Sequence, residues 1–162
     1  MDSIFRPGMR GYFIPLVAGV ILAVSAFLPW VIVGTESMTG VPDVAAWWVV
    51  GLGALAAVLA LLSLITRRNS RHPLLIIGLF ALGITFLCYR IMPRTAGERA
   101  STIAQAFAIV SETPMGAEPS AAVGVGLYVG MLASSALVGF GLTIVLKRAS
   151  QPYIVSPPDD DV

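Results

Sequence analysis

Four long hydrophobic stretches alternate with shorter polar segments along the chain. The stretches cover residues 12–33, 44–66, 73–92 and 121–146. Each is close to the ~20 residues that an α-helix needs to cross about 30 Å of hydrocarbon. Because lipid offers the backbone no hydrogen-bond partners, we expect helices here despite the many valines, isoleucines and glycines. The pattern predicts an all-α polytopic membrane protein, a bundle of four transmembrane helices that forms one domain over residues 1–148.

A short polar interruption, within residues 27–43, joins the first two stretches. It contains Pro29, which lacks an amide N–H and should end or kink the first helix. Glu36 and Asp43 are its only charged residues. The segment predicts a short hairpin on the outer side of the membrane.

Residues 94–120 form a second outer segment, which is too long to be only a turn. Thr95 and Glu98 have the spacing of a capping box at a helix N-terminus. A helix that begins at this capping box should end before Pro114. Apolar residues recur within it at helical spacing, at Ala100, Ile103, Ala104, Phe107 and Val110. We therefore expect an amphipathic helix over residues 96–112, with its apolar face on the bundle or in the membrane interface.

Composition supports the membrane assignment. Hydrophobic residues make up 57% of 162, charged residues 12%, and the mean hydropathy is +0.87. Soluble domains average about 45–50% apolar and about 25% charged residues. A net charge of +1 creates no field that would attract nucleic acid, so no nucleic-acid partner is expected.

The distribution of charge predicts the orientation in the membrane. Basic residues precede the first stretch, separate the second from the third, and follow the fourth, at Arg6, Arg10, Arg67, Arg68, Arg71, Lys147 and Arg148. The two outer segments carry a mixed, slightly acidic set of charges. Because lysine and arginine favour cytoplasmic loops, we expect both termini in the cytoplasm and the protein in the bacterial cytoplasmic (inner) membrane.

The two ends of the chain receive different predictions. The first hydrophobic stretch is longer than the roughly 7–15 residues of a signal-peptide core, which favours an uncleaved first helix. Residues 149–162 contain three prolines and three consecutive aspartates and have no hydrophobic period. They predict a disordered acidic tail in the cytoplasm.

Small residues recur every four positions in two of the predicted helices. The clearest row is Ala122, Gly126, Gly130 and Ser134, and a shorter one is Gly53 and Ala57. Such rows let helix backbones approach closely in lipid, where there is no hydrophobic drive for association. We assign them to helix packing, either inside the bundle or onto a partner.

Aromatic residues stand near the outer ends of the predicted helices. Trp30, Trp47, Trp48 and Tyr89 are expected at headgroup depth, where the ring stays in lipid and the polar atom reaches water. They are our predicted interfacial anchors.

Two polar residues near the helix ends have alternative interpretations. His72, the only histidine, lies at the cytoplasmic surface and is either simply interfacial or a ligand to a pigment, haem or lipid phosphate. Arg90, the only charge inside a predicted span, either snorkels to the headgroups or pairs with an outer carboxylate. For that ion pair the sequence offers Glu36, Glu112 and Glu118.

The sequence carries no recognisable catalytic constellation. It has no HExxH, GxSxG or CxxC motif and no phosphate-binding loop with its lysine. Its single cysteine, Cys88, excludes an intramolecular disulfide, and its single histidine excludes a multi-histidine metal site. We therefore predict no catalytic residues, no metal site and no cofactor, although contact with a lipid, quinone or pigment stays open.

Short motifs at the end of the first hydrophobic stretch and the start of the fourth suggest a family. The run Phe27-Leu28-Pro29-Trp30-Val31, a Gly/Ser/Thr-rich outer hairpin, and Val123-Gly124-Val125-Gly126-Leu127-Tyr128 together resemble a set of small bacterial four-span membrane proteins, common in actinobacteria. The chain is also similar in outline to the claudin-like plan of two outer loops with both ends inside. It lacks that family's paired cysteines and tryptophan signature, so no claudin function is implied.

These observations lead to one functional expectation and one rival. The scarcity of polar groups within the spans and the rows of small residues favour a non-catalytic structural or accessory subunit of a larger membrane protein complex. Its expected partners are other membrane subunits and bilayer lipids. The rival is a lipid-, quinone- or pigment-binding protein or small transporter, which an apolar groove beside Arg90 or His72 would favour.

Overall fold

The computed structural model describes residues 10–66, 71–112, 114 and 120–149. Four helices dominate the described chain: α1 (Phe13–Ser25), α2 (Val44–Thr66), α3 (Arg71–Ser111) and α4 (Val125–Ala149). A single turn of 3₁₀ helix, η1 (Arg10–Tyr12), leads into α1. Because α1 packs on α2 and α4, and α3 packs on α4 and α2, the four helices close into a ring. The helical bundle is as predicted.

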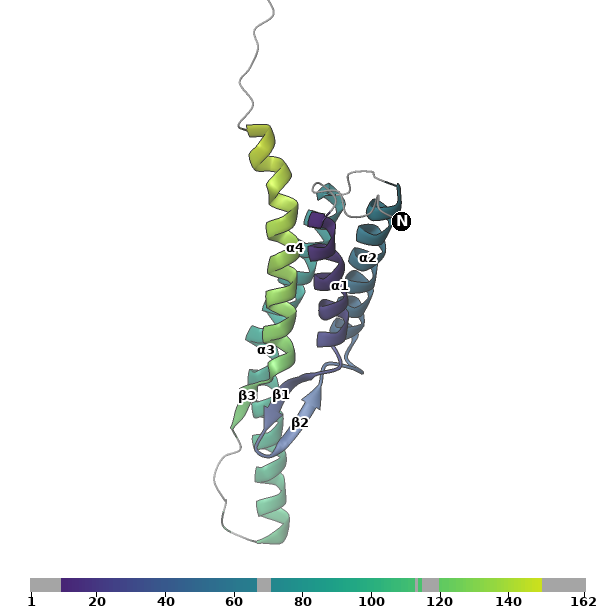
Figure 1. The fold of residues 1–162 in the computed structure, drawn as a ribbon. Coiled ribbons are helices and arrows are strands. Elements are labelled where there is room, and N and C mark those ends of the chain that lie inside the picture. The colour runs from purple at the N-terminus through teal and green to yellow at the C-terminus, as the bar shows by residue number, and fades with distance from the viewer. Residues whose placement is uncertain (1–9, 67–70, 113, 115–119, 150–162) are drawn as a thin grey trace, which may run out of the picture.

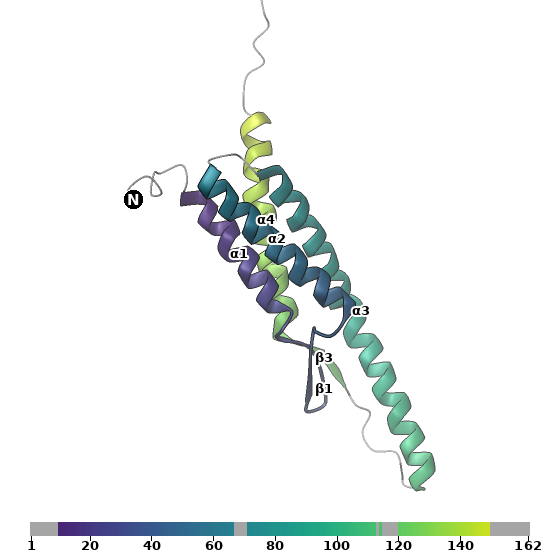
Figure 2. The ribbon, with the colours of Figure 1, turned by 90° about the vertical axis from the view of Figure 1, so that its right-hand side faces the viewer.

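The two ends of the bundle differ in character. η1, the end of α2, the start of α3 and the end of α4 lie together at one end (Figure 1). Three short strands lie at the opposite end, and α3 alone continues well beyond them (Figure 2). Arg10 and Arg71 belong to the first end, and Glu36, Asp43 and the charges of the α3 continuation belong to the second.

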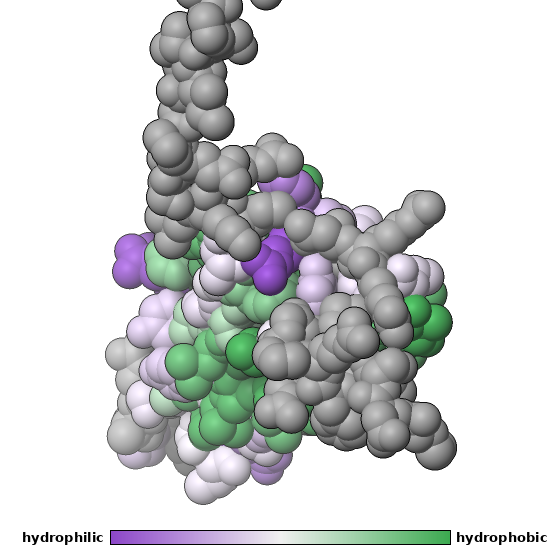
Figure 3. Space-filling view, turned by 45° about the horizontal axis from the view of Figure 1, so that its top comes forward, coloured by the Kyte–Doolittle hydropathy of each residue, from purple (hydrophilic) through white to green (hydrophobic). Residues whose placement is uncertain are grey.

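Three of the helices are long and apolar enough to cross a membrane: Val44–Thr66, Arg71–Ser111 and Val125–Thr143. α1 is equally apolar but has only 13 residues. Hydrophobic side chains of the bundle point outward as well as inward, and some of them are visible as the green patches in Figure 3. In water this surface would be costly, so lipid is its natural solvent and the protein is a membrane protein.

The first hydrophobic stretch is not one helix, contrary to our prediction. The helix ends at Ser25, and Pro29–Val33 forms the strand β1. Pro29 cannot extend the helical hydrogen-bond ladder, and the aromatic and β-branched residues after it favour extended backbone. Extended backbone is possible here because these residues find hydrogen-bond partners in two other strands.

The small sheet has the strand order β2-β1-β3 and is antiparallel throughout. β2 (Glu36–Thr39) returns from β1 through a two-residue turn, in which Gly34 has a φ of 60°. That conformation favours glycine at the first turn position of a hairpin. β3 (Ala121–Val123) pairs with the other edge of β1, so the start of the predicted fourth span is strand, and the helix begins only at Val125.

The third span and the outer helix are one continuous helix of 41 residues, not the two elements that we predicted. Pro93 lies inside it without ending it. Thr95 is therefore not an N-cap, and its hydroxyl donates to the carbonyl of Met92 at 3.1 Å. Glu98, the other half of the expected capping box, pairs with Arg94 at 3.0 Å instead. Membrane helices tolerate proline where other groups compensate for the missing hydrogen bond.

The end of α3 was predicted more closely. The helix ends at Ser111, and Glu112 follows in the left-handed conformation with a φ of 48°. The predicted end was residue 112, with Pro114 as the stop signal. The predicted acidic tail, residues 149–162, lies outside the described residues except for Ala149.

Candidate partner-binding surface

Trp30 connects the sheet to the bundle. Its side chain is only 1% exposed, and its indole N–H donates to the carbonyl of Ser25 at 2.9 Å. Its own carbonyl accepts a hydrogen bond from the amide of Gly124 at 2.8 Å. Trp30 therefore binds both the end of α1 and the segment that enters α4. As an interfacial anchor facing lipid it was predicted wrongly, because the protein itself satisfies the indole.

Glycines make room for the indole. A Cβ added to Gly40 would lie 2.5 Å from Cε2 of Trp30, and one added to Gly126 would lie 2.7 Å from its Cδ1. A Cβ on Gly124 would lie 2.3 Å from the carbonyl oxygen of Pro29. None of these positions can hold a larger residue without a shift of backbone or ring. The hairpin is thus held rigidly against the bundle.

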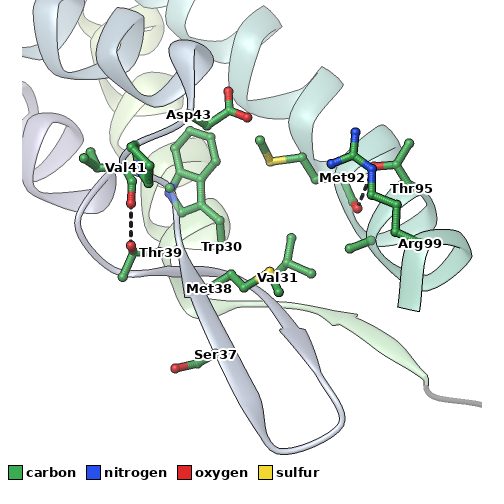
Figure 4. Close-up of a pocket in the computed structure, with 13 residues that line it drawn as sticks. Trp30, Val31, Ser37, Met38, Thr39, Val41, Asp43, Met92, Thr95 and Arg99 are labelled. Atoms are coloured by element: carbon green, nitrogen blue, oxygen red, sulfur yellow. Dashed lines mark hydrogen bonds between the residues drawn. The ribbon is translucent and has the colours of Figure 1, made fainter. Parts of the chain in front are cut away.

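A groove of about 580 Å³ separates the β1–β2 hairpin from α3. Its walls are apolar near the bundle, where Trp30, Met38 and Met92 face one another (Figure 4). Asp43 lies on one rim and Arg99 on the other. The groove is therefore amphipathic, with one charge of each sign at its mouth.

The two rim charges have different roles. One carboxylate oxygen of Asp43 accepts a hydrogen bond from the amide of Ala45 at 2.8 Å, which caps the N-terminus of α2. Arg99 is exposed and forms no ion pair within the described residues. The Asp43 carboxylate is thus already used within the fold, whereas the Arg99 guanidinium is available to a partner.

Beyond the groove, α3 projects away from the sheet (Figure 1). We call residues 97–111 the α3 extension. It ends in large apolar side chains that are exposed: Ile103 is 59% exposed, Phe107 70% and Val110 84%. Of the two predicted places for its apolar face, the bundle is wrong, because these side chains are exposed, and the membrane interface stays a prediction.

The remaining predicted anchors stay at the surface. Trp47 and Trp48 are exposed in the first turn of α2, close to the sheet end of the bundle. Tyr89 packs edge-on against Tyr128, with 5.8 Å between the ring centroids. Their place near the level of the hairpin suits headgroup depth.

Most of the predicted packing residues make close contacts inside the chain. A Cβ on Gly126 would lie 2.7 Å from the carbonyl oxygen of Ser25, and one on Gly130 would lie 3.0 Å from the Ser25 hydroxyl. Ser134 is fully buried, and its hydroxyl donates to the carbonyl of Gly130 at 2.8 Å. Of the two alternatives, the row therefore serves packing within the bundle. Ala122 does not belong to it, because it lies in β3 opposite Ile32.

The shorter row joins α1 to α2. A Cβ on Gly53 would lie 2.6 Å from the backbone nitrogen of Ala23, and one on Gly19 would lie 2.7 Å from that of Ala57. Two pairs of small residues thus face each other across this contact, which again is internal packing.

His72 and Arg90 lie away from the grooves. Both are exposed on α3, and neither lines the groove at the hairpin. Within the described residues Arg90 forms no ion pair with Glu36 or Glu112, while Glu118 lies outside them. Snorkelling to the headgroups and pairing with Glu118 both stay predictions. No three histidine, cysteine, aspartate or glutamate side chains gather into a metal site in the described ranges.

Sequence reasoning missed three residues of this surface. Met38, Met92 and Arg99 come from two distant segments, and nothing in their own neighbourhoods indicates a groove. One signal in the sequence could have indicated a continuous helix. Met92, Ala96 and Ala100 are four residues apart, so apolar residues keep the helical spacing on both sides of Pro93.

Comparisons with known proteins found no match. No family model matches the chain, and no curated protein matches it. The resemblance to small bacterial four-span proteins stays an expectation from short motifs.

Proposed function

We propose that the protein is a non-catalytic structural or accessory subunit of a larger membrane protein complex, and that the α3 extension is its recognition surface. The observation that carries the proposal is the exposure of Ile103, Phe107 and Val110 outside the membrane-crossing part of α3. Burying apolar surface is worth about 25 cal/mol per Å². A helix that presents such side chains to water therefore has binding energy available for a partner.

The same proposal places the chain in the bacterial cytoplasmic membrane with four spans and both termini inside. Arg10 and Arg71 lie at one end of the bundle with the ends of α2 and α4, which suits the cytoplasmic side. α1 is short, but it packs between α2 and α4 and so lies at the same depth as two membrane-length helices. The sheet and the α3 extension then face outward.

The rival proposal, a lipid-binding protein, has one observation in its favour. An apolar groove of about 630 Å³ lies between α1 and α4, lined by residues such as Phe13, Val17 and Leu132. Its walls suit an acyl chain. It offers little to the polar ring of a quinone or pigment, and Arg90, in the middle of α3, does not line it.

Native electrophoresis after gentle solubilisation separates the two proposals. An accessory subunit migrates with other polypeptides in an assembly much larger than its own 17.0 kDa. Migration as a bare monomer, with lipid but no co-purifying polypeptide, would overturn the subunit proposal and leave the lipid-binding one.

A further inference from the structure

The apolar residues of the α3 extension follow the spacing of a coiled-coil seam. From Ala96 the chain reaches Ala100, Ile103, Phe107 and Val110 by steps of four, three, four and three. These are the alternating steps of the a and d positions in a heptad. We call these five residues the seam. The seam predicts that another helix lies against α3.

The seam continues an interface that already exists. Ala96 packs against the hydrophobic core beneath the sheet, as does Met92 one turn before it. From Ala100 onward the seam leaves the sheet behind, and the exposure of its large members rises from 59% at Ile103 to 84% at Val110. A helix packed on the seam beyond Ala100 would therefore extend the same face of α3 that Met92 and Ala96 already pack against the core.

Lipid does not reach most of the seam. The groove joins Asp43 to Met92, so the outer start of α2 is level with this part of α3. Phe107 stands 14 residues after Pro93, which is roughly 21 Å along the helix axis. The headgroup layer adds only about 5–8 Å to each side of the hydrocarbon. The occupant of the seam must therefore come from the aqueous side.

The surface beside the seam is shaped to admit such an occupant. A second groove, of about 420 Å³, runs along the flank of the extension past Glu98, Thr102 and Ile103. It shares Thr95 and Arg99 with the groove at the hairpin. The two grooves are therefore neighbours along α3, the first at the hairpin and the second beside the extension.

Charge distinguishes among occupants. Arg94 and Glu98 pair with each other on the face opposite the seam. Arg99 flanks the seam at a g position and forms no ion pair within the described residues. In a parallel coiled coil a g residue faces the e position of the next heptad, where charged partners form salt bridges. In a second copy of this chain that residue is Ala104, which offers no charge to Arg99.

We propose that the α3 extension binds an amphipathic helix from the aqueous outer part of another membrane subunit, packed on the seam, with a carboxylate opposite Arg99. The inference rests on the proposed function and adds the nature of the partner. The partner helix carries apolar residues at spacings of three and four and at least one acidic residue beside them.

Site-specific photo-cross-linking in intact cells tests the inference. A photoreactive phenylalanine analogue is placed singly at positions 99 to 110 of the full chain, and cross-linked peptides are sequenced. We expect products at 103, 107 and 110 at least about tenfold stronger than at 102, 105 and 109. The partner peptides should have the apolar spacing and an acidic residue near the site reached from position 99. Cross-links to lipid, to a second copy of this chain, or without this periodicity would overturn the inference.

A pair of isoleucines supplies a matched control. Ile103 lies in the seam, and Ile109 lies on another face with an exposure of 79%. Ile103→Ser should lower the yield of the assembly about tenfold, while Ile109→Ser should leave it unchanged. Arg99→Glu should weaken the assembly, and Arg99→Lys should largely restore it. An intact assembly in all four variants overturns the inference but spares the proposed function, whereas a monomeric wild-type chain overturns the proposed function itself.

Discussion

Trp30 and Phe107 are both large aromatic residues toward the sheet end of the molecule, yet their exposures are 1% and 70%. Trp30 lies in a hairpin whose backbone and side chains contact α1, α3 and α4. Phe107 lies on a helix that has left every other element behind. The hairpin is stabilised by its own chain, whereas the apolar side chains of the α3 extension are exposed within the described residues.

This difference shows how outer segments of a membrane protein can be interpreted. Exposed apolar residues on the bundle, such as Phe80 and Phe86, lie on a membrane-length helix, where lipid is the expected environment. Equally exposed residues on the extension lie beyond the packed part of the bundle, so we interpret the same exposure differently there. The hairpin's glycines and tryptophan serve folding, and the extension's apolar residues are available for binding.

The largest expected effect comes from filling the space beside Trp30. Gly126→Leu places a side chain where even a Cβ would lie 2.7 Å from both the Ser25 carbonyl oxygen and the indole. We expect loss of the folded hairpin and a strong fall in the yield of monodisperse protein. Gly139→Leu, on the same helix with nothing within 4 Å of its added Cβ, is the control. Equal yields of the two variants would show that the Trp30 packing does not stabilise the hairpin.

The next effect comes from removing the indole itself. Trp30→Ala should lower the free energy of unfolding by about 3–5 kcal/mol, because it leaves a cavity and removes the hydrogen bond to Ser25. Thermal unfolding in detergent measures the change. Trp48→Ala removes an exposed indole from α2 and should have little effect. A smaller shift for Trp30→Ala than for Trp48→Ala would contradict this account of the hairpin.

A smaller effect is expected at the end of the hairpin. Asp43→Ala removes the N-cap of α2 and should cost about 1 kcal/mol. Glu36→Ala changes another exposed carboxylate of the same hairpin and should be neutral. The same thermal measurement applies, and identical midpoints for both variants would argue against the capping role.

The smallest effect on stability belongs to the extension. Phe107→Ser should change the free energy of unfolding of the purified chain by less than about 0.5 kcal/mol, because the ring is 70% exposed. A destabilisation comparable to that of Trp30→Ala would mean that the extension is packed within the chain after all.

Much of the bundle was predictable, because lipid imposes simple rules on long apolar stretches. α2 begins and ends at the predicted residues 44 and 66. The failures lie where other parts of the chain replace lipid as the hydrogen-bond partner. Residues 29–33 have the hydropathy of a membrane helix, and only pairing with β2 and β3 allows them to be a strand.

The candidate surface was less predictable than the fold. The buried position of Trp30 depends on Gly40, Gly124 and Gly126, two of them more than 90 residues away in sequence. Pro93 lies between the predicted third span and the predicted outer helix, and α3 passes through it without a break. The apolar period of the extension was found correctly, but its direction depends on the continuity of α3, which no local pattern determines.

Hydrogen exchange at the backbone tests the central claim most directly, because the hairpin serves as an internal reference. Exchange is compared between the chain in its native membrane and the purified chain in detergent. We predict that residues 100–111 exchange at least about tenfold more slowly in the native membrane, while residues 30–39 are equally protected in both. Equal exchange of residues 100–111 in the two states would show that nothing binds the α3 extension, and would contradict the account.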